Sequence, residues 1–416
     1  MIIWDRLAEA VQDVAAVRTG KTMAVLKKTE LVKARKLWEE VFEEDTAKFL
    51  DYYEIYVADH NQIFAEEEAG DVVSMVQLNP YRVHMGEEEA DSYYIVAVAT
   101  RESCRHQGRM RRLLTEALQF MYQEKIPFTF LMPASEAIYQ PFDFLTVYRQ
   151  SMFTHGAELD TDTDSSWHCI PCRREQLKEL AEWSDAFLQK HSEISTVRTE
   201  DYYKRIWMEQ ESMNGQILLF YEDSQMKGYC FTGYEGSGEA WEIAVEADNP
   251  EEQTGSEPRT VSDSQALANR RAVEALTRWF GVQDQLPIRI CGFLPESYID
   301  GIPLSEMTYR PMTMVRIVNL EAFVSHLRAK KPVQFVLYIK DPIIPENCGV
   351  FCFELGGEDA TLTRMEANTE QNKGAGEIPE LTISELAAAL YGVERNEKIP
   401  QSDIYLLEHV YLNEIV

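Results

Sequence analysis

Residues 93–114 read YYIVAVATRESCRHQGRMRRLL. The first part, Tyr93 to Thr100, is rich in β-branched and aromatic residues, which predicts a strand. The last part predicts a helix, because its apolar side chains recur at helical spacing: Met110, Leu113, Leu114, Ala117 and Leu118. The stretch is therefore a strand that leads through a short turn into a helix.

The turn between the strand and the helix, Arg105 to Met110, is basic. A glycine at such a turn lets neighbouring backbone N–H groups point outward together, and the helix N-terminus adds partial positive charge. Five basic side chains lie within eight consecutive residues: Arg105, His106, Arg109, Arg111 and Arg112. The whole chain, in contrast, has a formal net charge of −30. The turn therefore predicts a site for a specific anion, such as a phosphate group.

The turn and the strand before it resemble a coenzyme signature. Val98-Ala99-Thr100, followed by Arg105-x-x-Gly108-x-Met110, resembles the acetyl-CoA signature of the GNAT superfamily of N-acetyltransferases. That signature ends in Gly or Ala, where this chain has Met110. A basic helix start on the surface is the alternative. The resemblance implies acetyl-CoA as co-substrate, bound by Val98, Ala99, Thr100, Arg105, His106, Gln107, Gly108, Arg109, Met110 and Arg111.

Length and composition limit the possible classes of protein. The 416 residues are too many for one compact domain and fit two or three. No apolar run is long enough to span a membrane. The acidic balance argues against nucleic acid and anionic membranes as partners and favours cationic small molecules or basic peptides. Seven cysteines, an odd number spread thinly, are typical of reduced thiols in the cytoplasm.

The residues around the opening stretch predict one α/β unit. Thr29 is expected to cap a first helix, and a second helix runs from Thr46 to Tyr56. Strands are expected next at Gln62 to Glu66, Val72 to Met85 and Ser92 to Thr100. A helix to about Glu124 and a strand from Phe128 to Pro133 complete the unit. This order, helices and then β-β-β-α-β, is the order that the GNAT fold requires.

The segment Pro133 to Phe144 reads PASEAIYQPFDF. It is similar to the S-E-x-x-I-Y-x-x-F-x-[FY] segment of the enhanced-intracellular-survival family, a multi-domain branch of GNAT enzymes, with one residue missing between Glu136 and Tyr139. The resemblance implies that Tyr139 is the general acid and that Ser135 and Glu136 lie at the coenzyme. The alternative is that Tyr139 is a packed aromatic residue on an amphipathic helix.

Residues 153–300 predict a second unit with the same order of elements. Strands are expected at Gln216 to Tyr221, Met226 to Tyr234, Ala240 to Glu246 and Ile288 to Phe293, with a helix at Ser264 to Phe280. The loop before this helix is acidic and lacks the R-x-x-G-x-G pattern. We therefore expect a degenerate repeat that binds no acetyl-CoA.

A C-x-x-C pair, Cys169 and Cys172, lies in the same region. A zinc site would need two more ligands at metal spacing, and His168 alone does not complete one. We interpret the pair as chance spacing of unrelated thiols and expect no metal.

From about Gly301 the pattern changes. Strands are expected at Met312 to Val318, Val333 to Lys340, Gly349 to Leu355 and Ala360 to Glu366, followed by a helix. Together with MVRIVNLEAF, LYIKDPIIPENCGVFCF and LTISELAAALYG, this order resembles the sterol-carrier-protein-like domain that ends enhanced-intracellular-survival proteins. The predicted fold class is α/β (α+β): tandem GNAT folds, one catalytic and one degenerate, then a sterol-carrier-protein-like domain. The expected domains are 1–152, 153–300 and 301–416.

The resemblance implies an enzyme that moves the acetyl group of acetyl-CoA to a primary amine by direct attack. The acceptor is either an aminoglycoside-like polyamine or a lysine side chain. In the family the C-terminal carboxylate, here that of Val416, reaches the catalytic tyrosine, and the enzymes are hexamers. Two alternatives stay open: a non-catalytic module that binds acetyl-CoA or a lipid, and an interaction protein that holds a basic partner.

Overall fold

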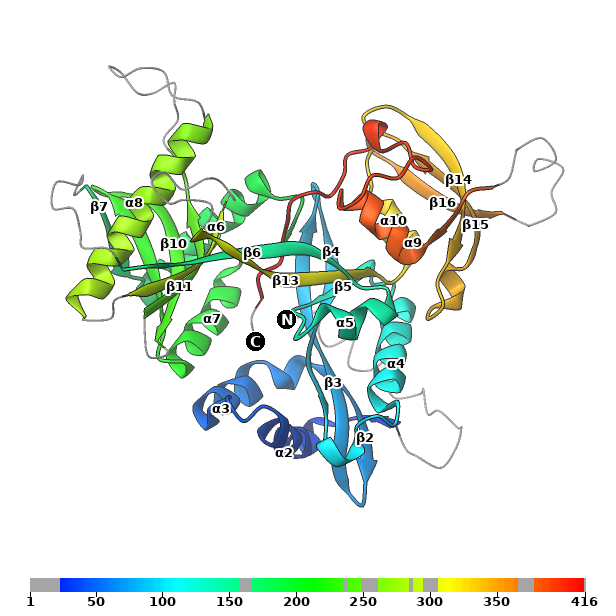
Figure 1. The fold of residues 1–416 in the computed structure, drawn as a ribbon, viewed down its shortest axis with the longest axis horizontal. Coiled ribbons are helices and arrows are strands. Elements are labelled where there is room, and N and C mark those ends of the chain that lie inside the picture. Colours follow the sequence, from blue (N-terminus) through cyan, green and yellow to red (C-terminus); the bar gives the residue numbers. More distant parts are fainter. Residues whose placement is uncertain are drawn as a thin grey trace.

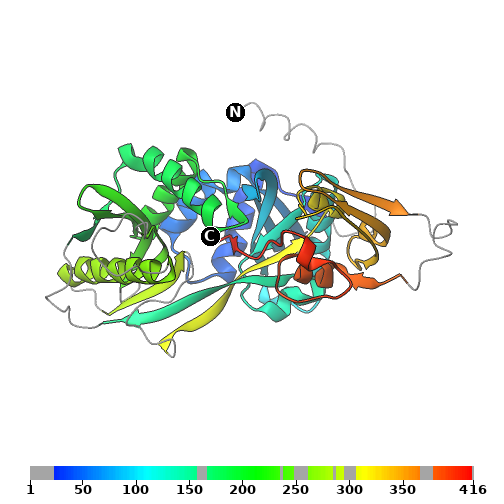
Figure 2. The same cartoon turned by 90° about the horizontal axis from the view of Figure 1, so that it is seen from above.

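The protein is built from three units. The computed structural model describes residues 23–156, 166–234, 238–247, 261–283, 287–294, 306–365 and 378–414. Figure 1 shows the units in the colours of the chain, the first in blue and cyan, the second in green and the third in orange and red. The view from above shows that the first unit lies between the other two (Figure 2).

The first unit follows the expected order of elements. Thr46 caps its second helix, because its hydroxyl accepts a hydrogen bond of 3.2 Å from the N–H of Phe49. The expected cap at Thr29 is wrong. Thr29 lies inside a 3₁₀ turn, Lys28–Glu30, so Glu30 is the residue that precedes the first helix. The elements are β1 Met23–Val25, α2 Leu31–Val41, α3 Ala47–Tyr56, β2 Gln62–Glu68, β3 Asp71–Met85, β4 Glu88–Thr100, α4 Arg109–Gln123 and β5 Phe128–Leu131.

The second unit also contains the expected strands and helices. Its acidic loop, residues 248–258, lies outside the described residues. The elements are β6 Leu145–His155, β7 Trp167–Pro171, α6 Leu177–His191, β8 Ile194–Thr196, α7 Glu200–Ser212, β9 Gln216–Glu222, β10 Gln225–Tyr234, β11 Gly238–Val245, α8 Val261–Val282 and β12 Ile288–Leu294.

A β-bulge recurs at the same place in both units. In β4, two residues, Ala97 and Val98, lie opposite one residue of β3, and Ala97 has a φ of 49°. In β11, two residues lie opposite Cys230 of β10, and the first of them, Glu242, has a φ of 51°. In each unit the bulged strand then pairs in parallel with the strand that follows the long helix. The second unit is thus a structural repeat of the first.

The two repeats exchange their last strands. β6 follows the first repeat in the chain but pairs with β12 of the second. β13, Thr308–Ile317, follows the second repeat but pairs with β5 of the first, and with β6. The two sheets are thereby joined into one, which has 14 strands among the described residues. The expected boundary at residue 152 falls inside β6, and β13 belongs to this large sheet rather than to the third unit.

The third unit has its own sheet, with the strand order β16-β15-β14-β17. Thr382 and Glu385 form a capping box at its second helix, with bonds of 3.1 Å and 2.7 Å. The elements are α9 Leu320–Ser325, β14 Val333–Lys340, β15 Gly349–Leu355, β16 Ala360–Met365, β17 Glu380–Thr382 and α10 Ile383–Leu390. A final strand, β18 Val410–Tyr411, leaves this unit and pairs with β8 of the second. Among the described residues no helix is both long and apolar enough to cross a membrane.

Candidate active site

The first unit has an open strand edge that the second unit lacks. β4 and β5 pair only at Tyr93 with Thr129 and at Tyr94 with Phe130. β4 continues beyond these pairs to Thr100. In the second unit β11 and β12 pair from Gly238 with Ile288 to Ala244 with Leu294, and so stay together on both sides of the bulge. The bulge at Ala97 lies on the open part of β4, and bulges often turn backbone groups toward a site.

The backbone of Thr100 faces this open edge. The N–H of Arg101 donates to the carbonyl of Val73 in β3 at 2.9 Å, and the carbonyl of Ala99 accepts from the hydroxyl of Ser74 in β3 at 3.1 Å. Because backbone groups alternate along a strand, the N–H and carbonyl of Thr100 point away from β3, toward the open edge. In agreement, the Thr100 carbonyl accepts a bond of 3.2 Å from Nε of Arg105. The end of β4 therefore presents a backbone donor to the open edge.

The basic turn follows β4 and opens α4. His106 and Gly108 have φ values of 60° and 71°, in the left-handed region, and Gly108 is the residue that precedes the helix. The first N–H groups of a helix have no acceptor within the helix. The turn is exposed from Arg105 to Gly108. The turn therefore leaves backbone exposed at the start of α4, where the sequence predicts an anion.

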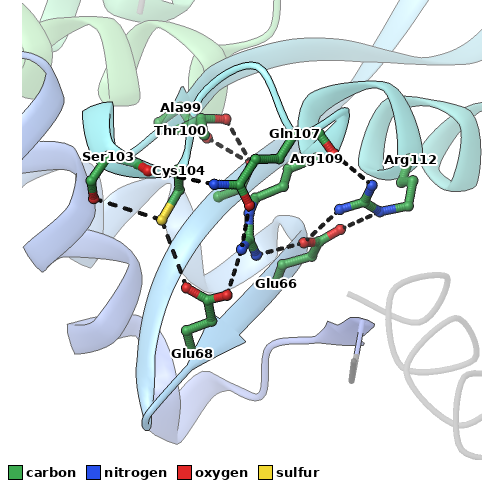
Figure 3. A network of polar contacts seen from close by, with 10 residues as sticks. Glu66, Glu68, Ala99, Thr100, Ser103, Cys104, Gln107, Arg109 and Arg112 are labelled. Atoms are coloured by element: carbon green, nitrogen blue, oxygen red, sulfur yellow. Dashed lines mark hydrogen bonds and ion pairs between the residues drawn. The ribbon is translucent and has the colours of Figure 1, made fainter. Parts of the chain in front are cut away.

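Two carboxylates of β2 partly neutralise the positive charge at the turn and the start of α4, as Figure 3 shows. Arg109 is only 2% exposed and donates to Glu66 at 2.8 Å and to Glu68 at 2.5 Å. Arg112 donates to both oxygens of Glu66, at 2.8 and 3.0 Å. The expectation that Arg109 presents its charge to the anion is therefore corrected. Buried Glu66 requires cationic partners, and the guanidinium of Arg109 points inward to supply one.

Sequence reasoning missed the two carboxylates of β2 that hold these arginines. Their signal was present in the acidic run at residues 66–68, because alternate residues of a strand lie on one face. Arg105, His106 and Arg111 remain exposed, and Met110 is half-buried in α4. The guanidinium of Arg111 lies 4.9 Å from the ring centroid of Phe142.

Tyr139 lies in a short helix, α5 Glu136–Tyr139, which Ser135 precedes. Its side chain is 7% exposed and meets the ring of Phe144 edge-on, with centroids 6.0 Å apart. Burial raises the pKa of Tyr139 to about 12. Ser135 is exposed, whereas the carboxylate of Glu136 accepts from Arg149 at 2.8 Å and from Thr146.

The last described residue, Glu414, lies among the groups that surround Tyr94. Burial raises the pKa of Tyr94, and the Glu414 carboxylate and Tyr139 add to the shift. Glu414 accepts from Thr196 at 2.7 Å and from Tyr202 at 3.2 Å. Val416, the expected partner of Tyr139, lies outside the described residues.

A buried cluster of charged groups surrounds Glu414. Arg198 lies 3.1 Å from Glu242 and 3.7 Å from Glu414, and Arg205 lies 3.6 Å from Glu414. Burial raises the pKa of the third carboxyl group, Glu209, to about 7. Three carboxyl groups thus accompany two guanidinium groups. This cluster could not be predicted from local patterns, because its members come from α7, β11, the turn before α7 and the segment after β18.

The C-x-x-C pair consists of two ordinary buried thiols. Cys169 is in β7 and donates to the carbonyl of Ala275, and Cys172 donates to that of Arg173, both at 3.5 Å. Burial raises the pKa of each thiol to about 12, so neither is a reactive thiolate at neutral pH. In the part of the chain that the structure describes, no group of three or more His, Cys, Asp or Glu residues could hold a metal.

Comparison with known proteins assigns two of the units. Residues 23–147 match the acetyltransferase (GNAT) domain family. The chain carries a GNAT acetyltransferase domain. Residues 320–399 match the sterol carrier protein domain family. The open edge of β4, the basic turn and Tyr139 all lie in the GNAT domain, so the protein is an acyltransferase of the GNAT type.

Solved structures share the fold of nearly the whole chain. A conserved protein of unknown function from Enterococcus faecalis V583, named a probable N-acyltransferase, matches with a TM-score of 0.69 and 16% identity over 96% of this chain and 100% of its own. A GCN5-related N-acetyltransferase from Kribbella flavida gives 0.66 and 14% over 95% and 98%. Eis1 from Mycobacterium abscessus gives 0.58 and 11% over 93% and 94%.

At these identities the likeness concerns the fold, which extends beyond the GNAT domain into the repeat and the sterol carrier protein domain. No curated protein matches the chain.

Proposed function

We propose that this protein is an N-acetyltransferase that moves the acetyl group of acetyl-CoA to a primary amine. The observation that carries the proposal is the open edge of β4 beyond Tyr94, with a basic helix start at its end and a buried tyrosine nearby. The closed pairing of β11 and β12 supports assigning the chemistry to the first repeat alone.

The coenzyme is proposed to bind along this edge. The pyrophosphate would meet the N–H groups at Gly108 and the start of α4, where the helix dipole favours an anion. Arg105 and Arg111 are exposed beside it. The N–H of Thr100 faces the same edge and is a donor for the thioester carbonyl, as in an oxyanion hole.

The reaction is proposed to run by direct attack of the amine on the thioester carbonyl. A lysine-like amine has a pKa of about 10.4 and must lose a proton, to water or a carboxylate, before or during attack. A C–N bond then forms and the C–S bond breaks. Tyr139 donates its proton to the leaving thiolate. Because its pKa is about 12, the phenol is fully protonated at neutral pH, so the proton to be transferred is present.

The acceptor is proposed to be cationic, either an aminoglycoside-like polyamine or a lysine side chain. The chain has a formal net charge of −30. Such a field attracts cations and holds them. The carboxylate of Val416 is proposed to lie near Tyr139, by resemblance to the enhanced-intracellular-survival enzymes.

Titration with acetyl-CoA in a calorimeter tests the binding half of the proposal. We expect one coenzyme per chain, because β11 and β12 stay paired among the described residues and the sequence before α8 is acidic rather than basic. Two equal sites would contradict the assignment of the second repeat, and absence of binding would remove acetyl-CoA as co-substrate.

We further propose a cytoplasmic homo-oligomer, a hexamer by resemblance to the enhanced-intracellular-survival enzymes. Sedimentation at micromolar concentration is expected to give a species several times heavier than the 48.0 kDa chain. A single species at the mass of one chain would contradict this part of the proposal.

A further inference from the structure

Arg316, at the end of β13, is a completely buried arginine with a bond from each guanidinium nitrogen. Nε donates to the carbonyl of Phe142 at 2.7 Å, Nη1 to the carbonyl of Ile317 at 2.8 Å and Nη2 to Asp341 at 2.6 Å. Both Arg316 and Asp341 have side-chain exposures of 0%. The guanidinium therefore joins the segment after Tyr139 to a carboxylate of the sterol carrier protein domain.

The carboxylate end of this bridge is rigid. One oxygen of Asp341 also accepts from the N–H groups of Ile343 and Ile344, at 3.0 and 2.9 Å, and the other accepts from Asn347 at 2.9 Å. Asn347 in turn donates to the carbonyl of Val318 at 2.8 Å. The turn from Asp341 to Asn347 is thus a preformed anchor for Arg316.

The Phe142 end of the bridge lies in the segment that carries Tyr139. Phe142 closes a 3₁₀ turn, Gln140–Phe142, that directly follows Tyr139. Its ring lies under Arg111 of the basic turn region, and the next aromatic residue, Phe144, packs on Tyr139. Holding the Phe142 carbonyl therefore fixes the turn that follows Tyr139. Through the Phe142 ring, the same turn contacts α4.

Stability alone is a weak reason for such a bridge. Removing two charges from water costs free energy that their attraction repays only with good geometry, and apolar residues often serve as well. A planar guanidinium, in contrast, fixes three acceptors in one arrangement.

We infer that Arg316 is a positioning residue for the acetyl transfer, through which the sterol carrier protein domain holds the Tyr139 segment in place. The inference rests on the proposed role of Tyr139 as general acid. It gives the third unit a function in catalysis that needs no ligand of its own.

Arg316→Lys tests the inference. Lysine keeps the positive charge, but its single ammonium group cannot donate to the Phe142 carbonyl and to Asp341 with the planar geometry of a guanidinium group. We expect kcat to fall about tenfold, with acetyl-CoA affinity within about twofold of wild type. In the Tyr139→Phe background the same change should lower kcat no further, because both changes act on one group. A merely structural role would lower kcat equally in both backgrounds.

Arg328→Lys is the matched control. Arg328 also joins the third unit to the first, through an ion pair with Glu88, but at the start of β4 and far along the strand from its open end. Its variant should keep wild-type kcat. If Arg316→Lys does not fold, Arg316→Gln serves in the same cycle, since it leaves Asp341 with its bonds from Ile343, Ile344 and Asn347.

Three outcomes decide against the inference. Wild-type kcat in Arg316→Lys, beside a slow Tyr139→Phe, would overturn it and leave the proposed function intact. Equal losses in both backgrounds would make Arg316 structural. Wild-type kcat in Tyr139→Phe would refute the general acid itself, and the inference with it.

Discussion

Tyr139→Phe is expected to lower kcat by about 10² or more while acetyl-CoA affinity stays nearly unchanged. The substitution removes only the hydroxyl group and keeps the ring that packs on Phe144. Without that proton donor the thiolate must leave unprotonated or take its proton from water. The measurement is steady-state release of free thiol, combined with coenzyme titration of the folded variant.

Tyr93→Phe is the matched control for this variant. Burial raises the pKa of Tyr93 to about 12 as well, but its ring lies beside Phe120 near the end of α4, with centroids 6.1 Å apart. It should turn over at the wild-type rate. Wild-type turnover in Tyr139→Phe would show that the general-acid assignment is wrong.

The pH profile of kcat follows from the same group. A pKa raised to about 12 means that Tyr139 keeps its proton well above the usual tyrosine range, so it should impose no descending limb below about pH 10.

A C-terminal extension of a few residues should also lower kcat if the Val416 carboxylate orients Tyr139. The two changes combined should then cost much less than the sum of their separate losses.

Gly108→Val is expected to weaken acetyl-CoA binding by more than about tenfold, or about 1.4 kcal/mol. Gly108 has a φ of 71°, where a β-branched residue is a strained outlier. A Cβ at this position would meet Nη1 of Arg112 at an ordinary 3.5 Å, so the strain lies in the backbone rather than in packing. The turn must change shape, and its N–H groups then leave the phosphate position.

Gly86→Val provides the control for backbone strain. Gly86 has a φ of 65° in the turn between β3 and β4, and a Cβ there would meet nothing within 4 Å. Its variant should bear a similar strain and keep wild-type coenzyme affinity. Equal affinities for wild type and a folded Gly108→Val, measured by calorimetry, would remove the phosphate assignment.

Local patterns predicted much of the fold. The strand Tyr93 to Thr100, the turn at Gly108 and the helix after it are set by residues adjacent in the chain, and the structure has them where expected. The exchange of β6 and β13 could not be predicted in this way. The strand that pairs with β5 is β13, almost two hundred residues later in the chain. The alternation of residues within β13 predicts a strand but does not identify its neighbour.

The candidate site shows the same difference between residues in contiguous motifs and residues that meet only in the fold. Gly108 and Tyr139 stand in contiguous motifs, so the sequence pointed to them directly. The inward turn of Arg109 toward Glu66, and the bridge from Arg316 to Asp341, each depend on side chains from separate elements. Such pairings are decided by burial, because a buried charge needs a partner wherever the fold supplies one.

Release of free thiol from acetyl-CoA in the presence of amines tests the central claim most directly. The panel would contain an aminoglycoside, a linear polyamine and a lysine peptide, each with the full-length protein at neutral pH. We predict amine-dependent release, with one acetylated amine formed for each thiol. Coenzyme binding without amine-dependent thiol release from any of the three would contradict the account and favour a non-catalytic acetyl-CoA-binding protein.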